Sequence, residues 1–170
     1  GNDAVNVLNV TLSLLLLLNI GSSCAAQTTV NADDALKRLQ EGNARYMSGK
    51  SAHPRFDPIA RETTAREGQT PIATILGCSD ARVPPEVIFD QGFGDLFIIR
   101  VAGNVVAPAE LASIEYGTKY LATPLIVVLG HTNCGAIEGA LSGAKLRGSL
   151  PQLMALIAPA IEQLKKDRPD

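Results

Sequence analysis

The hydrophobic and polar positions along the chain predict strands and helices in alternation. Three short runs of consecutive apolar residues, at 72–76, 96–101 and 125–129, are typical of buried parallel strands. Between the second and third runs, residues 108–121 begin with proline and place apolar side chains at helical spacing, which predicts a crossover helix. A strand, a helix and a strand in succession indicate an α/β fold with a mostly parallel sheet flanked by helices.

Further helices are predicted on both sides of this region. Asn31 can cap a helix whose first turn carries Asp33 and Asp34, two acidic residues that the helix dipole favours. This helix runs to about Met47 and forms an N-terminal helical arm. The spacing of apolar residues and the turn residues at the ends predict three more helices, at 59–67, 135–141 and 151–166.

The first 26 residues have a different pattern from the rest of the chain. Residues 5–20 are apolar and rich in leucine, and small residues follow at 21–26, as in a signal peptide. We therefore expect a leader at 1–26, a folded domain at 27–170, and a periplasmic or otherwise exported bacterial protein. Cys24 loosely matches a lipoprotein cleavage box, so a lipid anchor on Cys24 and an ordinary signal with an incidental cysteine are alternatives.

Composition and charge exclude several classes of partner. The chain is 46% hydrophobic and 19% charged with a net charge of −2, which is typical of a globular domain. Because no basic face is evident, no nucleic-acid partner is expected. Aromatic residues make up only 4% and tryptophan is absent, so the core should consist mainly of aliphatic side chains.

Four candidate metal ligands follow two of the predicted strands. Cys78 and Asp80 come directly after the first strand, and His131 and Cys134 come directly after the third. In a parallel sheet with strand order 2-1-3, the carboxyl ends of these two strands are neighbours at the topological switch point. Two thiolates, one imidazole and one carboxylate make a tetrahedral Zn²⁺ set, so one zinc ion per chain is expected.

Other interpretations of these residues remain open. One alternative is a zinc site that only stabilises the fold of a non-catalytic interaction module, and another is a dithiol protein without a metal. The second is disfavoured because Cys78 and Cys134 are not a Cys-x-x-Cys pair. His53 lies in a polar segment, which favours a solvated side chain over a proton shuttle.

The residues around the candidate ligands resemble the β-class carbonic anhydrases. The segments CSDARVPPEVIFDQGFGDLFIIRVAGNVV and LIVVLGHTNCGAIEGAL carry the pattern Cys-x-Asp-x-Arg followed by His-x-x-Cys, and the likeness extends over 33–170. The resemblance implies reversible hydration of carbon dioxide to bicarbonate and a proton, in a homodimer or homotetramer. Family members usually continue into further strands after the last helix, so the resemblance also predicts that this chain lacks them.

The expected mechanism assigns separate roles to Asp80 and Arg82. Zinc lowers the pKa of bound water toward ~7, and the resulting hydroxide attacks carbon dioxide. Four protein ligands would leave no place for that water, so Asp80 must leave the metal and pair with the guanidinium of Arg82. The resemblance also implies four substrate-binding residues: Gln69, Phe97, Tyr116 and Gly135. Hydrolysis of carbonyl sulfide or carbon disulfide on the same fold is an alternative.

Overall fold

The computed structural model describes residues 28–143 and 145–168 of the chain. The predicted leader and Cys24 therefore lie outside the described residues. The elements in chain order are α1 (Ala32–Met47), α2 (Pro58–Glu67), β1 (Ala73–Gly77), α3 (Pro85–Ile88), β2 (Leu96–Arg100), the 3-10 turn η1 (Ala102–Asn104), α4 (Pro108–Glu115), the π-helix η2 (Tyr116–Tyr120), β3 (Ile126–Leu129), α5 (Gly135–Ser142) and α6 (Leu150–Asp167).

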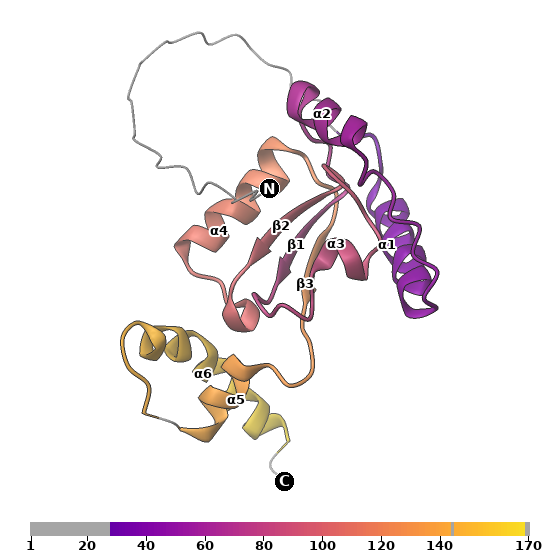
Figure 1. The fold of residues 1–170 in the computed structure, drawn as a ribbon. Helices are drawn as coiled ribbons and strands as arrows, with labels where there is room; N and C mark the ends of the chain where they lie inside the picture. The colour runs from indigo at the N-terminus through magenta and orange to yellow at the C-terminus, as the bar shows by residue number, and fades with distance from the viewer. Residues whose placement is uncertain (1–27, 144, 169–170) are drawn as a thin grey trace, which may run out of the picture.

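The three described strands form a parallel sheet in the order β2-β1-β3. This confirms the predicted α/β class and the predicted strand order. Gly77 at the end of β1 is opposite Arg100 of β2 and Leu129 of β3, so the carboxyl ends of all three strands lie at one edge. Helices α5 and α6 pack together beyond that edge (Figure 1).

The hydrophobic core lies between the sheet and α1. Ala35 and Leu39 of α1 pack with Ile72, Ile75 and Leu96, and all five side chains are buried. The capping prediction is confirmed, because the Oδ1 of Asn31 accepts a hydrogen bond from the backbone N–H of Asp34 at 2.9 Å. Asp33 and Asp34 in the first turn of α1 are exposed to solvent, whereas Ala35 and Leu39 cover one face of the sheet.

The prediction that all three runs are buried strands is wrong for β3. Ile126 and Val128 are 48% and 62% exposed, and the alternate residues Val127 and Leu129 are half-buried. In the part of the chain that the structure describes, β3 is an edge strand with one face away from the core. A continuous apolar run cannot distinguish a central strand from such an edge strand, because it does not show which face is covered.

The crossover helix also differs from its prediction, since the α-helix ends at Glu115 and a π-helical turn continues to Tyr120. Gly117 lies in this turn close to the sheet, and a Cβ added to it would be only 2.3 Å from the Oγ1 of Thr74. The widened turn therefore lets the backbone approach β1 more closely than any residue with a side chain would allow.

No helix within residues 28–143 or 145–168 has the length and apolar character that a membrane span needs.

Candidate metal centre

The structure brings three of the four predicted ligands together at the carboxyl edge of the sheet. Cys78 follows β1 directly, His131 lies two residues after β3, and Cys134 is the residue before α5. Their ligand atoms all lie within 4.8 Å of one another, and the two Sγ atoms are 3.9 Å apart. Both cysteines are free thiols and are buried, so the centre is shielded from water on the sulfur side.

The orientation of His131 suits metal binding. Its Nδ1 lies 3.0 Å from the carbonyl oxygen of Thr132, a geometry in which Nδ1–H donates to that oxygen. Nε2 is then the unprotonated nitrogen. It is buried, and no hydrogen-bond partner for it exists among the described residues. A buried nitrogen with an unused lone pair beside two thiols is the arrangement that a metal ion satisfies.

The environment of Cys78 favours its thiolate form. Burial opposes ionisation of this thiol, but hydrogen bonds from the backbone of Asp80 and Gly103, together with the adjacent polar side chains of His131 and Cys134, outweigh burial. Together they lower the pKa of Cys78 to about 7. The backbone N–H of Gly103 donates to the sulfur at 3.4 Å. Because the thiolate is the metal-binding form, the fold prepares this ligand.

Asp80, the fourth predicted ligand, lies outside this group because its carboxylate pairs with Arg82. Nε and Nη2 of Arg82 donate to the two carboxylate oxygens at 2.8 and 2.7 Å, and the backbone N–H of Arg82 adds a third bond at 2.9 Å. These bonds hold the pKa of Asp80 well below its usual range. Nη2 also donates to the carbonyl of Asn133 at 2.9 Å, which links the two ligand-bearing loops.

Two thiols and one imidazole nitrogen are the donor set of sulfur- and nitrogen-preferring metals such as zinc. A tetrahedral ion with bonds of ~2.3 Å to sulfur separates two sulfur ligands by about 3.8 Å. The observed Sγ separation of 3.9 Å matches that geometry. Since Asp80 is held by Arg82, the three residues fit a metal with one coordination position left open.

The predicted substrate-binding residues are divided between the two ends of the sheet. Gly135 begins α5 directly after Cys134, so its backbone is at the centre. Phe97 is opposite Thr74 in the strand register, and its ring lies 5.8 Å from that of Tyr116. Cys78 is four residue steps along the chain from Thr74, a span of about 13 Å in an extended strand.

Gln69 is also distant from the centre of its own chain. It lies beside Gly94, before the amino ends of β1 and β2, whereas the candidate ligands follow the carboxyl ends. The structure therefore does not bring Gln69, Phe97 or Tyr116 to the metal ligands within one chain. Their assignment to the substrate pocket stays a prediction.

Sequence reasoning missed two residues that contact the centre. Gly103 has a positive φ of 71° and donates to the Cys78 sulfur, while Arg100 donates from Nε to the Cys78 carbonyl oxygen at 2.8 Å. Both belong to the segment that leaves the carboxyl end of β2. Their position at the same edge as Cys78 was the available signal, because parallel strands end together there.

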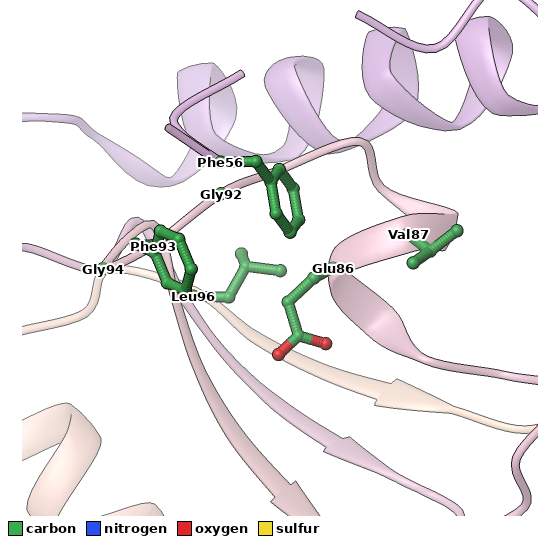
Figure 2. Close-up of a pocket in the computed structure, with 7 residues that line it drawn as sticks. All are labelled: Phe56, Glu86, Val87, Gly92, Phe93, Gly94 and Leu96. Atoms are coloured by element: carbon green, nitrogen blue, oxygen red, sulfur yellow. The ribbon is translucent and has the colours of Figure 1, made fainter. Parts of the chain in front are cut away.

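A separate cavity of about 270 Å³ lies beside the start of β2. Figure 2 shows Phe56, Phe93 and Leu96 on one side of it and Glu86 and Val87 of α3 on the other. The candidate metal ligands do not line this cavity. It is largely apolar with a single carboxylate, and it does not contribute to the metal centre.

Comparisons with known proteins agree with this geometry. The family model described as carbonic anhydrase matches residues 73–170. The chain is 43% identical over 138 residues to carbonic anhydrase 2 of Mycobacterium tuberculosis, covering 78% of this chain and 66% of that protein. It is also 43% identical over 131 residues to a carbonic anhydrase of Mycolicibacterium smegmatis, covering 75% of this chain and 63% of that protein.

Solved structures are similar in fold as well. A tetrameric β-carbonic anhydrase of Sordaria macrospora has a TM-score of 0.59 and 31% identity, with 78% of this chain and 66% of that chain covered. The β-carbonic anhydrase of Coccomyxa, solved with acetazolamide, has a TM-score of 0.56 and 26% identity, with 75% and 58% covered. The chain spans somewhat less than two thirds of the length of the curated relatives described above.

Proposed function

The chain belongs to the carbonic anhydrase family, in its β class, and from this premise we propose that it catalyses the reversible hydration of carbon dioxide to bicarbonate and a proton. The observation that carries the proposal is the convergence of Cys78, His131 and Cys134 within 4.8 Å of one another at the carboxyl edge of the sheet. Two buried thiols beside an imidazole nitrogen without a hydrogen-bond partner are the donor set of a metal site, and the family match indicates which reaction that metal would serve.

Zinc is the metal we propose for this centre. The two thiolates and the Nε2 of His131 would hold it, and the ion supplies a Lewis acid that allows water to ionise near neutral pH. The low pKa of Cys78 supports the assignment, because this ligand needs little energy to lose its proton. The Nδ1 contact with the Thr132 carbonyl holds the imidazole ring in the orientation that directs Nε2 inward.

Asp80 and Arg82 control access to the fourth coordination position in this proposal. The carboxylate forms the bidentate pair with Arg82, which would leave that position open for water, whereas a carboxylate released from Arg82 would be free to fill it. In the paired state, Asp80 retains lone pairs that can accept a hydrogen bond from the reacting water. The exchange is the mechanism predicted from the sequence, and the observed pair supports its open state.

The substrate pocket is proposed to form between two copies of the chain. Gly135 contributes its backbone N–H at the start of α5, where a bicarbonate anion is favoured. Gln69, Phe97 and Tyr116 lie too far from the metal ligands of their own chain, so a second copy would supply them. The tetrameric assembly of the Sordaria relative supports an oligomer, either a homodimer or a homotetramer.

The cellular address is a further part of the proposal. The leader-like segment at 1–26 supports export to the periplasm, with Cys24 as the attachment site if the protein carries a lipid anchor. Mass spectrometry of the protein purified from its host tests this directly. Cleavage after Ser23 with a lipid on Cys24 supports the anchor, cleavage elsewhere supports a soluble exported form, and an uncleaved chain contradicts both.

The proposed reaction is tested by zinc content per chain and by stopped-flow hydration of carbon dioxide from about pH 6.5 to about pH 9. One zinc per chain with activity that rises toward alkaline pH is expected. Asp80→Asn should retain zinc and lose most of the activity, because an amide cannot form the same charged pair with Arg82. Asp57→Asn is the matched control, since Asp57 accepts a backbone N–H at the start of α2, away from the centre.

Three results would contradict the proposal in different ways. One zinc per chain without hydration at any pH would indicate a site that only stabilises the fold. Absence of zinc would contradict the ligand assignment itself. Hydrolysis of carbon disulfide without hydration of carbon dioxide would support the metal centre and contradict the proposed substrate.

A further inference from the structure

Arg100 is the last residue of β2, and its side chain reaches across to the turn that carries Cys78 and Asp80. Its Nε donates to the carbonyl oxygen of Cys78 at 2.8 Å, and its Nη2 donates to the carbonyl oxygen of Asp80. One guanidinium therefore holds the backbone on both sides of Ser79. The strand register makes this reach available, because Arg100 is opposite Gly77, the residue before Cys78.

The two contacts differ in kind from those of Arg82. Arg82 binds the carboxylate of Asp80 and the carbonyl of Asn133. One of its partners is therefore the side chain that changes position in the proposed exchange. Among the described residues, Arg100 donates hydrogen bonds to main-chain carbonyls of the turn and to no side chain. A planar guanidinium with several N–H groups can hold two carbonyls at a fixed separation, which an ammonium on a flexible stem does less well.

By holding those two carbonyls, Arg100 fixes the backbone positions from which the side chains of Cys78 and Asp80 extend. The Cα of Cys78 sets the direction of its thiol, and the Cα of Asp80 is the pivot for its carboxylate. The backbone of the turn is otherwise tied to the extension of β2 by the N–H of Ser79 to the carbonyl of Val101 at 3.3 Å and by the N–H of Val101 to the carbonyl of Gly77 at 3.1 Å. Both bonds precede Asp80, so Arg100 contributes the tie between β2 and the Asp80 end of the turn.

We infer that Arg100 is a positioning residue of the metal centre, and its catalytic consequence rests on the proposed function. Arg100 keeps the turn rigid, so that the Cys78 sulfur stays directed at His131 and Cys134. It also restricts the movement of Asp80 to rotation of its side chain, because the main chain at Asp80 is anchored. Outer contacts of this kind orient ligands and commonly change metal affinity by about 10- to 100-fold when they are removed.

The anchoring is tested on the purified full-length protein by hydrogen–deuterium exchange of the backbone amides at 79–83. Arg100→Lys keeps the positive charge and most of the side-chain length but loses the planar fork, so exchange in this turn should be faster than in the wild type. Arg55→Lys is the matched control, since Nε and Nη2 of Arg55 also donate to a main-chain carbonyl, that of Phe93, away from the metal centre. It should leave exchange at 79–83 unchanged.

The effect on the ligands is measured by the rate of zinc release to a chelator and by the absorption spectrum of the cobalt-substituted protein. Arg100→Lys should release zinc about tenfold faster and alter the cobalt–thiolate bands, whereas Arg55→Lys should match the wild type in both. Wild-type rates and spectra in Arg100→Lys would overturn the inference, as would an equal change in the two variants. If the wild-type chain binds no zinc, the proposed function fails, and the exchange measurement still decides whether Arg100 anchors the turn.

Discussion

Replacement of Gly103 by alanine should destabilise the protein at the metal centre itself. Gly103 has a φ of 71°, and a residue with a Cβ loses about 1–2 kcal/mol in this left-handed conformation. The added Cβ would also lie 3.0 Å from the Cδ1 of Ile157 and 3.2 Å from the Cβ of Ala136. The Ile157 contact can relax by side-chain rotation, but Ala136 has no such freedom, so overpacking should add about 1 kcal/mol. The expected total is about 2–3 kcal/mol.

The control for this change is Gly49→Ala. Gly49 has a φ of 67°, and a Cβ built on it meets no atom of the described residues within 4 Å. This variant should therefore lose only the conformational part, about 1–2 kcal/mol. The free energies of unfolding of both variants, measured in urea, separate the loss caused by the positive φ from the loss caused by contact with α5 and α6. For a chain of this size, each 1 kcal/mol corresponds to about 2–4 °C in the thermal midpoint.

A second measurement follows from the hydrogen bond that Gly103 makes. Its backbone N–H donates to the Cys78 sulfur at 3.4 Å, so a shift of this turn away from Ala136 would weaken that bond. Gly103→Ala should therefore release zinc to a chelator faster than the wild type, whereas Gly49→Ala should not. Equal destabilisation in the two variants, together with unchanged zinc release, would refute the packing argument.

Three further predictions concern charge and metal. Arg82→Ala removes the partner of the Asp80 carboxylate, which is then free to occupy the metal, so carbon dioxide hydration should fall most at neutral pH; an unchanged stopped-flow pH profile would count against the exchange. Burial disfavours the charged form of Asp90, but hydrogen bonds from Ala52, Arg45 and His53 outweigh it and lower the pKa of this carboxyl. Its stabilising contribution is therefore present above the unfolded-state pKa of about 3.9 and is lost as pH falls through the lower folded-state value. Asp90→Asn should accordingly reduce stability at neutral pH and flatten the decline below about pH 4 in urea titrations; parallel curves for the two proteins would contradict this. Removal of zinc by a chelator should lower the thermal midpoint in calorimetry, since an ion present at 1,000 times its Kd stabilises by about 4 kcal/mol, and an unchanged midpoint would argue against a bound metal.

The sequence alone determined most of the secondary structure and the position of the candidate ligands along it. Asn31 predicted the start of α1, and the three apolar runs predicted β1, β2 and β3 to within about two residues. Cys78 and His131 could be placed because each follows a strand, and parallel strands bring their carboxyl ends to one edge. These predictions succeeded because capping, strand pattern and strand direction depend on residues close together in the chain.

The tertiary structure decided what lies around those ligands. It showed that Arg100 and Gly103 contact the turn of Cys78, and that Phe97 lies near the other end of the sheet. It also showed that one face of β3 is exposed. A hydrogen bond across 20 or more residues, and the choice of which face of a strand is covered, depend on how elements pack in three dimensions. Local sequence carries the chemical groups for such contacts, but it does not specify which of their potential partners they meet.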